Sequence, residues 1–212
     1  MEVLITVPHG ASEGDEPHPT DVGALEFVGY LEDALEGFNL KAVTHIGTVS
    51  RDVLDLNRLR AYSHRWHDQY RKMVKSADVH IDLHSFPEVP DYENDPEKYQ
   101  TSTGYDLRVW STGHAVIFFT PEITPSDLVG AIEQGIVDAG MEVIDQEGGF
   151  ENYVSNVANV LMDTPSVLLE INEGESQDYQ VLATAVALGI REYLDSFGPS
   201  PQSDEPLPAE LS

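Results

Sequence analysis

The chain has no cysteine, few lysines and no long apolar run, and each absence excludes a class of protein. Without cysteine, the 212 residues form neither a disulfide nor a thiolate metal site, so a bound metal must use His, Asp or Glu. No apolar stretch approaches the ~18 residues of a membrane span. Residues 1–7 lack the basic region of a signal peptide. We therefore expect a soluble, cytoplasmic protein, with transport on a virus particle as the alternative.

Cations are scarce: 11 Lys and Arg stand against 38 Asp and Glu, which gives a net charge of −27 and a pI of about 4.3. This excess predicts no nucleic-acid partner and no membrane partner, because both require a cationic surface. The hydrophobic fraction of 41% is that of a folded protein. Acidic surfaces with few lysines resemble those of extreme halophiles. We expect a haloarchaeal cytoplasm or a virus of such a host, with an ordinary acidic protein as the alternative.

Apolar runs alternate with helical periodicities along the chain. We expect strands at 3–7, 40–46, 78–83, 115–119, 140–144 and 166–171, and helices at 20–36, 59–75, 125–139, 152–161 and 176–197. This alternation predicts one three-layer α/β/α domain over residues 1–197, with a mostly parallel mixed sheet. Residues 87–104 are predicted to be a long loop over a site. Residues 198–212 are predicted to be an acidic, Pro- and Ser-rich, unpacked tail.

Polar side chains gather where the predicted strands end. His9 follows the first strand and His84 the third, Glu170 lies late in another strand, and the segment 50–58 follows the second. Taken singly, each histidine is more often a plain loop residue, and segment 50–58 would be a salt-bridged loop. In open α/β sheets, however, sites form beyond the carboxyl ends of the strands. We therefore expect these four clusters to line one cleft.

His9, His84 and an acid of the loop 13–16 make a set of two histidines and one carboxylate. Zinc in hydrolases commonly takes three such protein ligands and leaves a fourth position for water. His80 and Asp82 precede His84 by four and two residues, on the same side of a strand, and are candidate partners of its ring.

Glu170 is a carboxylate in an otherwise apolar strand, where an unpaired acid is costly. The functional hypothesis is a general base whose pKa is raised toward neutrality by apolar surroundings. The alternative is a strand-end glutamate paired with an arginine. In segment 50–58, Arg51, Asn57 and Arg58 offer guanidinium groups and an amide that can hold a carboxylate and polarise a carbonyl, with Asp55 orienting an arginine.

Four stretches resemble motifs of the N-formylglutamate amidohydrolase family: Val7-Pro8-His9-Gly10, Ser50 to Arg58, Asp82-Leu83-His84-Ser85 and Leu168 to Asn172. They stand in family order and cover roughly residues 3–175. The family belongs to the clan of zinc carboxypeptidase-like hydrolases, which also holds aspartoacylase-like deacylases and phage poly-γ-glutamate hydrolases. The resemblance implies a zinc carboxypeptidase-like fold and Zn²⁺ as cofactor. It also implies hydrolysis of an amide bond in a small carboxylate-bearing substrate, such as N-formylglutamate or another N-acyl amino acid.

The same resemblance implies a role for each site residue. His9 and His84 bind zinc, Glu170 is the catalytic acid and base, and Arg51 polarises the scissile carbonyl. Asn57 and Arg58 hold a substrate carboxylate. In this clan a glutamate follows the first histidine at variable spacing. Glu13 is the best placed, with Glu16 and Asp15 behind it, and His18 and Asp21 also remain open.

Two other functions stay open from the sequence. One is a metallopeptidase or poly-γ-glutamate hydrolase of the same fold, of viral or cellular origin, which differs in substrate size. The other is a structural or binding protein that keeps the fold and the metal without turnover, since a fold shared by a clan does not fix the reaction.

Overall fold

The computed structural model describes residues 1–11, 20–86, 107–110, 112–148, 153–174 and 177–197. The predicted loops at 13–16 and 87–104 and the predicted tail at 198–212 lie outside these residues. Within them, no helix combines the length and the apolar character needed to cross a lipid bilayer.

Six strands form one mixed sheet in the order β2-β1-β3-β6-β4-β5. The parallel strands β2, β1, β3 and β6 are followed by β4, which runs antiparallel to β6, and by β5, which runs parallel to β4. This confirms the predicted α/β fold with a mostly parallel mixed sheet. The strands are β1 (Glu2–Val7), β2 (Lys41–Ile46), β3 (Val79–Phe86), β4 (Ala115–Phe119), β5 (Val143–Glu147) and β6 (Ser166–Asn172).

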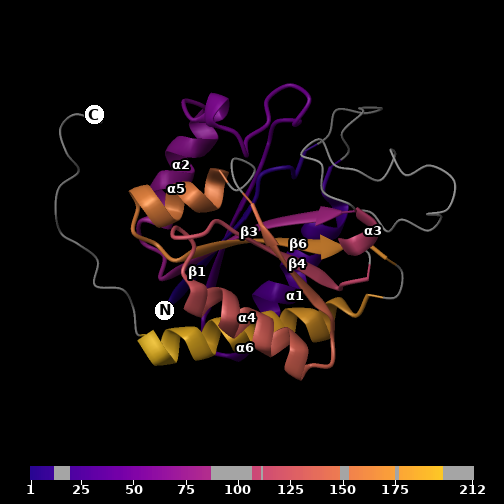
Figure 1. Ribbon diagram of the computed structural model, residues 1–212. Helices are drawn as coiled ribbons and strands as arrows, with labels where there is room; N and C mark the ends of the chain where they lie inside the picture. Colours follow the sequence, from indigo (N-terminus) through magenta and orange to yellow (C-terminus); the bar gives the residue numbers. More distant parts are fainter. Residues whose placement is uncertain (12–19, 87–106, 111, 149–152, 175–176, 198–212) are drawn as a thin grey trace, which may run out of the picture.

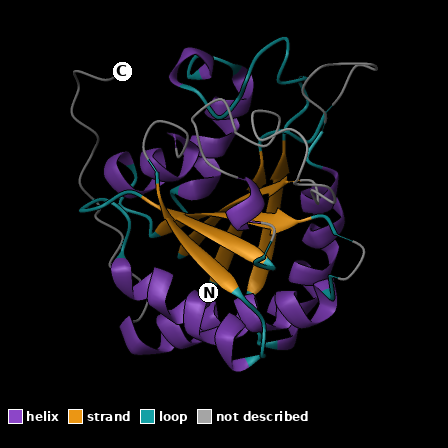
Figure 2. Ribbon diagram, turned by 45° about the vertical axis from the view of Figure 1, so that its right-hand side comes forward, coloured by secondary structure: helices purple, strands orange, loops and turns teal. Residues whose placement is uncertain are grey.

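Helices cover both faces of the sheet (Figure 1). The lower layer contains α1 (Val22–Gly37), α4 (Ser126–Asp138) and α6 (Tyr179–Phe197), and the upper layer contains α2 (Arg65–Val74) and α5 (Tyr153–Leu161). Figure 2 shows the twisted sheet between the two helical layers. Two shorter pieces complete the described elements, the 3₁₀ turn η1 (Leu59–Ala61) and α3 (Leu107–Trp110).

Side-chain alternation gives the sheet two unlike faces. We call the side covered by α1, α4 and α6 the apolar face, and the side covered by α2 and α5 the polar face. In β3, Val79, Ile81 and Leu83 join the large core cluster of the apolar face. His80, Asp82 and His84 alternate with them and point to the polar face. The polar face also has an apolar core of its own, in which β1 meets α2 and α5: Leu4, Leu56, Trp66, Tyr70, Val154 and Ala158.

Some element boundaries differ from the sequence-based prediction. The helix expected at 59–75 is divided into η1 and α2, because the His64 ring accepts a hydrogen bond from the backbone N–H of Trp66 and begins a new helix. The strand expected to end at 83 continues to Phe86, so His84 lies inside β3. The strand expected at 140–144 begins at Val143, because Gly140 has a positive φ of 75° in the turn that ends α4.

Candidate metal centre

Three side chains from separate parts of the chain meet beside the polar face of the sheet. His9 follows β1, Asp21 precedes α1 and His84 lies in β3. Asp21 Oδ2 lies 3.2 Å from His9 Nδ1 and 2.9 Å from His84 Nδ1. The three side chains are buried, and one ligand atom from each lies within 4.8 Å of the others. Within the part of the chain that the structure describes, His9, Asp21 and His84 form a group that could hold a metal ion.

Asp21 reaches the histidines because another acid caps its helix. Asp21 occupies the N-cap position of α1, but its side chain makes no capping hydrogen bond. Instead, Glu173, just after β6, accepts from the backbone N–H of Gly23 at 3.1 Å and from the Ser85 hydroxyl at 2.5 Å. Gly23 is required there, since a Cβ would lie 2.6 Å from Glu173 Cγ. The Asp21 backbone N–H donates to the His9 carbonyl at 3.1 Å, which holds the two residues together.

Each histidine has polar groups near its second ring nitrogen. His9 Nε2 lies 2.9 Å from Asp55 Oδ1. His84 Nε2 lies 3.1 Å from Asn57 Nδ2 and 3.6 Å from Asp82 Oδ2. Metal-ligating histidines usually donate their second N–H to a carboxylate or carbonyl, which leaves the other nitrogen free for the metal. For His9, the contact of Nε2 with Asp55 leaves Nδ1, which faces Asp21, for an ion. For His84, the Asn57 Nδ2 group only donates, so Asp82 Oδ2 at 3.6 Å is the acceptor for an Nε2 proton when Nδ1 binds an ion. This donor set fits a bound metal.

Asp55 reaches His9 because the loop after β2 runs very close to the loop after β1. Gly47 donates its N–H to the Val7 carbonyl at 2.7 Å. A Cβ on Gly47 would lie 1.9 Å from the Pro8 carbonyl oxygen, so only glycine permits this approach. The sequence spacing of Asp55 and His9 carries no sign of their contact.

The charges around the two imidazoles also favour a cation. Burial would raise the pKa of Asp21, but hydrogen bonds from His84 and His9 hold it well below its ordinary value. Burial would lower the pKa of His84, whereas the carboxylates of Asp82 and Asp21 raise it well above 6.5. Burial would likewise raise the pKa of Asp55, but the His9 hydrogen bond holds it below its ordinary value. Acids outnumber the histidines here, and a divalent ion would compensate them.

Asp82 is fully buried beneath the centre, at the middle of a polar network. Its Oδ1 accepts from the Thr6 hydroxyl at 2.7 Å, and its Oδ2 has no hydrogen-bond partner among the described residues. His80 lies between Thr6 and Ser166, with contacts of 2.9 Å and 2.6 Å. Burial lowers the pKa of His80 to about 4, so its ring is neutral. Of the two predicted partners of His84, only Asp82 lies next to the ring.

Glu170 lies beside the centre on the neighbouring strand. In the parallel pairing of β3 and β6 it stands opposite His84. Among the described residues its half-buried carboxylate has no hydrogen-bond or ion-pair partner. Burial raises the pKa of Glu170 from 4.5 to about 7, although the charges of His84, His9 and Arg51 act to lower it. A carboxylate with such a pKa exchanges protons near neutral pH, as a general base must.

Segment 50–58 forms a wall of the centre, and its members differ in position. Asn57 is 2% exposed, and its Oδ1 accepts from the Val154 N–H, so the amide joins His84 to the start of α5. The Arg58 side chain is 31% exposed; it donates to the Asn57 carbonyl and lies 3.6 Å from Asp55. Arg51 is half-buried, makes no side-chain hydrogen bond to a described residue, and influences the pKa of both Asp55 and Glu170.

Next to this wall is a cavity of about 420 Å³, lined by Asp55, Arg58, Leu59, Arg60 and Tyr153. Of the residues predicted from the sequence, the structure brings His9, His84 and Glu170 together with segment 50–58. Glu13, Asp15, Glu16 and His18 lie outside the described residues. Asp21 was one of several open candidates for the third ligand, and among the described residues it is the one that lies beside both histidines.

No protein-family model and no curated protein matches this sequence. Solved structures do match it in fold. An N-formylglutamate amidohydrolase from Ralstonia eutropha aligns with a TM-score of 0.58 and 15% identity, over 92% of this chain and 94% of that one. The catalytic domain of the N-acetylmuramoyl-L-alanine amidase CwlV from Bacillus (Paenibacillus) polymyxa aligns with a TM-score of 0.56 and 16% identity, over 92% and 98%.

A metallo-carboxypeptidase from Burkholderia cenocepacia aligns with a TM-score of 0.60 and 12% identity, over 92% of this chain and 57% of that one. At these identities the comparisons establish the fold alone. The chain has the fold of zinc carboxypeptidase-like hydrolases and amidases.

Proposed function

We propose that the protein is a zinc-dependent amidohydrolase that cleaves an amide bond in a small carboxylate-bearing substrate. N-Formylglutamate and other N-acyl amino acids are the first candidates. The observation that carries the proposal is the convergence of His9 Nδ1, Asp21 and His84 Nδ1, with Glu170 in register beside His84. Amidases and a carboxypeptidase among the solved structures of the same fold support it.

The donor set favours zinc over magnesium or calcium. Two imidazole nitrogens and one carboxylate are typical of catalytic zinc, whereas magnesium and calcium prefer all-oxygen sites. Bound here, zinc would supply Lewis-acid chemistry, which makes water a stronger nucleophile and polarises a carbonyl. We propose Asp21, instead of Glu13, as the third ligand.

The remaining steps belong to the protein's own side chains. Glu170, ionised near neutral pH, takes the proton of the attacking water and passes it to the leaving nitrogen. Arg51 stabilises the negative charge that develops on the scissile carbonyl oxygen. Arg58 pairs with the substrate carboxylate in the adjoining cavity. Asn57, whose carbonyl accepts from Arg58, contributes to this clamp through the position of the guanidinium group.

The test compares two carboxylate variants. We expect the wild-type protein to contain one zinc per chain and to hydrolyse N-formylglutamate or another N-acyl amino acid, in low or high salt. Asp21→Ala should lose both the metal and the turnover, while Glu13→Ala should keep both. Metal content is measured by elemental analysis of the purified proteins.

Three outcomes would contradict this proposal. A wild-type protein without metal would exclude every metal-dependent function. Loss of metal in Glu13→Ala with retention in Asp21→Ala would reverse the ligand assignment. Bound zinc without hydrolysis of any amide in the series would favour a binding protein of the same fold.

A further inference from the structure

Basic residues are concentrated in one part of this acidic chain. Residues 51–75, which we call the basic segment, contain seven of the 11 Lys and Arg but only three of the 38 Asp and Glu. The segment begins at the wall of the metal centre, continues through η1 and includes all of α2. Locally it is a cationic stretch in a protein with a net charge of −27.

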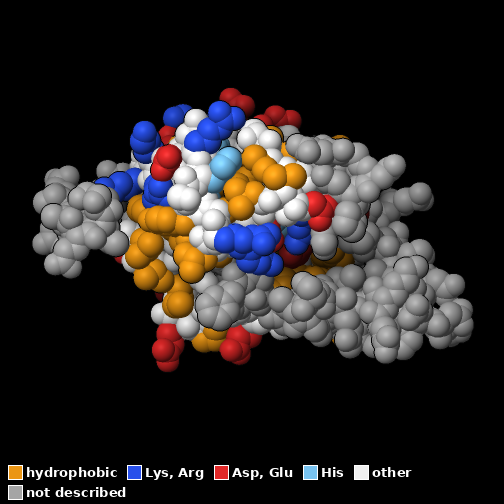
Figure 3. Space-filling view, turned by 90° about the horizontal axis from the view of Figure 1, so that it is seen from above, with side chains coloured by type: hydrophobic (Ala, Val, Ile, Leu, Met, Phe, Trp, Pro, Cys, Tyr) orange, Lys and Arg blue, Asp and Glu red, His pale blue; other side chains and the backbone are white. Residues whose placement is uncertain are grey.

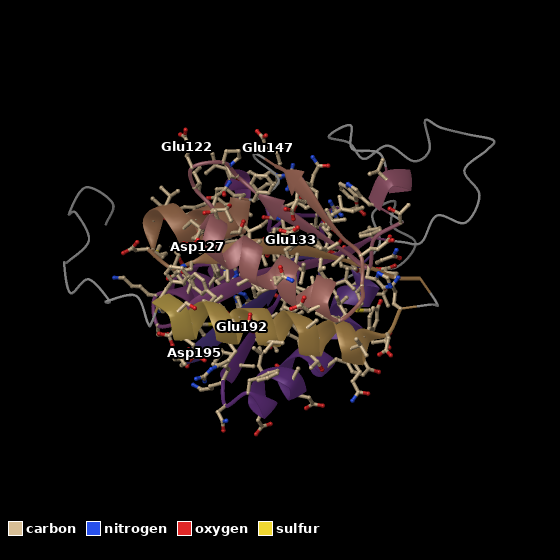
Figure 4. All side chains as sticks on the ribbon, turned by 60° about the horizontal axis from the view of Figure 1, so that its bottom comes forward. Glu122, Asp127, Glu133, Glu147, Glu192 and Asp195 are labelled. Carbon is tan, nitrogen blue, oxygen red and sulfur yellow. The ribbon has the colours of Figure 1, made fainter. Side chains whose placement is uncertain are left out.

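The two helical layers therefore carry opposite charges. Figure 3 views the molecule from above and shows Lys and Arg side chains gathered on that face. Figure 4 brings the lower side forward, where acids on and near α4 and α6 are labelled. These acids are Glu122, Asp127, Glu133, Glu147, Glu192 and Asp195.

The fold itself does not use most of these cations. Arg60, Arg65, Lys72 and Lys75 are exposed and form no ion pair or hydrogen bond with a described residue. Arg71 is the exception, since it pairs with Asp68 and lies 4.3 Å from the centre of the Tyr62 ring. Arg65 is the first residue of α2, where the helix dipole disfavours a positive charge. The exposure and placement of these cations are better explained by binding to another molecule than by stabilisation of the fold.

The basic segment is continuous with the centre. Arg58 and Arg60 line the cavity of about 420 Å³ together with Asp55, which contacts His9. From there α2 extends for ten residues, or about 15 Å at 1.5 Å per residue. A single amino acid does not span that length, whereas about four residues of extended peptide do.

We propose that the basic segment binds an acidic peptide that continues from the scissile amide, so that the substrate carries several carboxylates. This inference rests on the proposed function and specifies the class of its substrate. Hydrolysis of one amide bond of the peptide would consume one water molecule and release a carboxylate and an amine. A short acidic peptide suits the surface better than nucleic acid, because the net charge of −27 repels a long polyanion.

The test uses N-acyl oligoglutamates of one to about eight residues, in an α-linked and a γ-linked series. The test variant is Arg65→Gln/Lys72→Gln/Lys75→Gln, and the control is Lys41→Gln, an exposed cation outside the segment that pairs with Glu2. In the wild type and the control, KM should fall as carboxylates are added, by about tenfold for three exposed contacts. In the triple variant this dependence on length should disappear, while hydrolysis of N-acylglutamate stays unchanged.

Binding of fluorescent oligoglutamate, measured by anisotropy, separates this proposal from the proposed function. If N-acylglutamate is hydrolysed with no effect of peptide length, and the triple variant binds oligoglutamate as well as the wild type, the basic segment does not bind the peptide. The proposed amidohydrolase function would be unaffected by that result. Binding that requires the three cations, in a protein that hydrolyses nothing, would support the surface and overturn the function. Tighter binding of a single-stranded oligonucleotide of equal charge would overturn the assignment to a peptide. The preferred series distinguishes an α-linked from a γ-linked chain.

Discussion

The two faces of the sheet differ in what they bury, and β3 contributes to both. On the apolar face its Val79, Ile81 and Leu83 pack with α1, α4 and α6 in one large aliphatic cluster. On the polar face the alternate residues His80, Asp82 and His84 are equally buried. Their hydrogen-bond partners are polar: Thr6 for His80 and Asp82, and Asn57 for His84. The comparison indicates that the apolar face stabilises the fold, while the polar face holds the side chains of the proposed metal centre.

The polar face is the less favourable of the two to bury. Asp82 Oδ2, His67 Nδ1 and Trp66 Nε1 are buried there without a hydrogen-bond partner among the described residues. Each such group costs about 1–3 kcal/mol. A fold selected for stability alone would fill these positions with aliphatic side chains. The apolar face, with its aliphatic cluster, offsets this cost.

Neighbouring residues of β6 offer the sharpest test of the comparison, because Leu169 points to the apolar face and Glu170 to the polar face. Glu170→Gln should lower kcat about 10³-fold, since an amide takes no proton from water. It should leave metal content intact and stability no lower. Leu169→Ala should instead cost about 2–5 kcal/mol of unfolding free energy through the cavity it leaves. Its kcat per folded molecule should stay near the wild-type value.

Steady-state kinetics and urea denaturation of the two variants measure both quantities. A Glu170→Gln protein that retains turnover would remove Glu170 from the mechanism. A Leu169→Ala protein that stays stable but loses kcat would show that the two faces do not divide stability and chemistry in this way.

The buried histidines make the polar face sensitive to acid. Burial lowers the pKa of His80 and His67 from 6.5 to about 4, so both are neutral in the folded protein. Below pH 6.5 these two histidines bind protons in the unfolded chain but stay unprotonated in the folded chain. The stability that these two neutral histidines contribute is therefore complete above pH 6.5 and is lost as the pH falls toward 4, by about 2 kcal/mol per histidine between pH 7 and pH 5. Glu170, whose pKa is raised to about 7, contributes in the opposite direction over the same range.

Urea denaturation at the two pH values measures this loss. His80→Gln can still hydrogen-bond Thr6 and Ser166 but does not titrate, so the loss should shrink by about 2 kcal/mol. An unchanged loss in His80→Gln would exclude His80 as its source.

The strands could be predicted from the sequence, because alternating or continuous apolar residues are a local pattern that does not depend on tertiary contacts. The alternation around His84 already placed His80 and Asp82 on its side of the strand. The proposed third ligand could not be chosen from the sequence, because Asp21 stands at a helix start, where an acid has an ordinary capping role. Only the tertiary contact between Glu173 and Gly23 frees its side chain. The contact of Asp55 with His9 was equally hidden, because it depends on the close approach at Gly47.

The smallest effect we expect concerns the outer edge of the polar face. Arg58 is partly exposed beside the cavity, so solvent would screen its proposed contact with a substrate carboxylate. Arg58→Ala should raise KM for carboxylate substrates about tenfold and leave kcat nearly unchanged, because it removes binding that is equal in ground and transition states. Arg191→Ala is the matched control: this arginine of α6 pairs with Asp195 in the opposite layer, and its loss should not change KM. Equal KM values in both variants would place the substrate carboxylate elsewhere, whereas a fall in kcat with Arg58→Ala would mean that Arg58 also acts in the transition state.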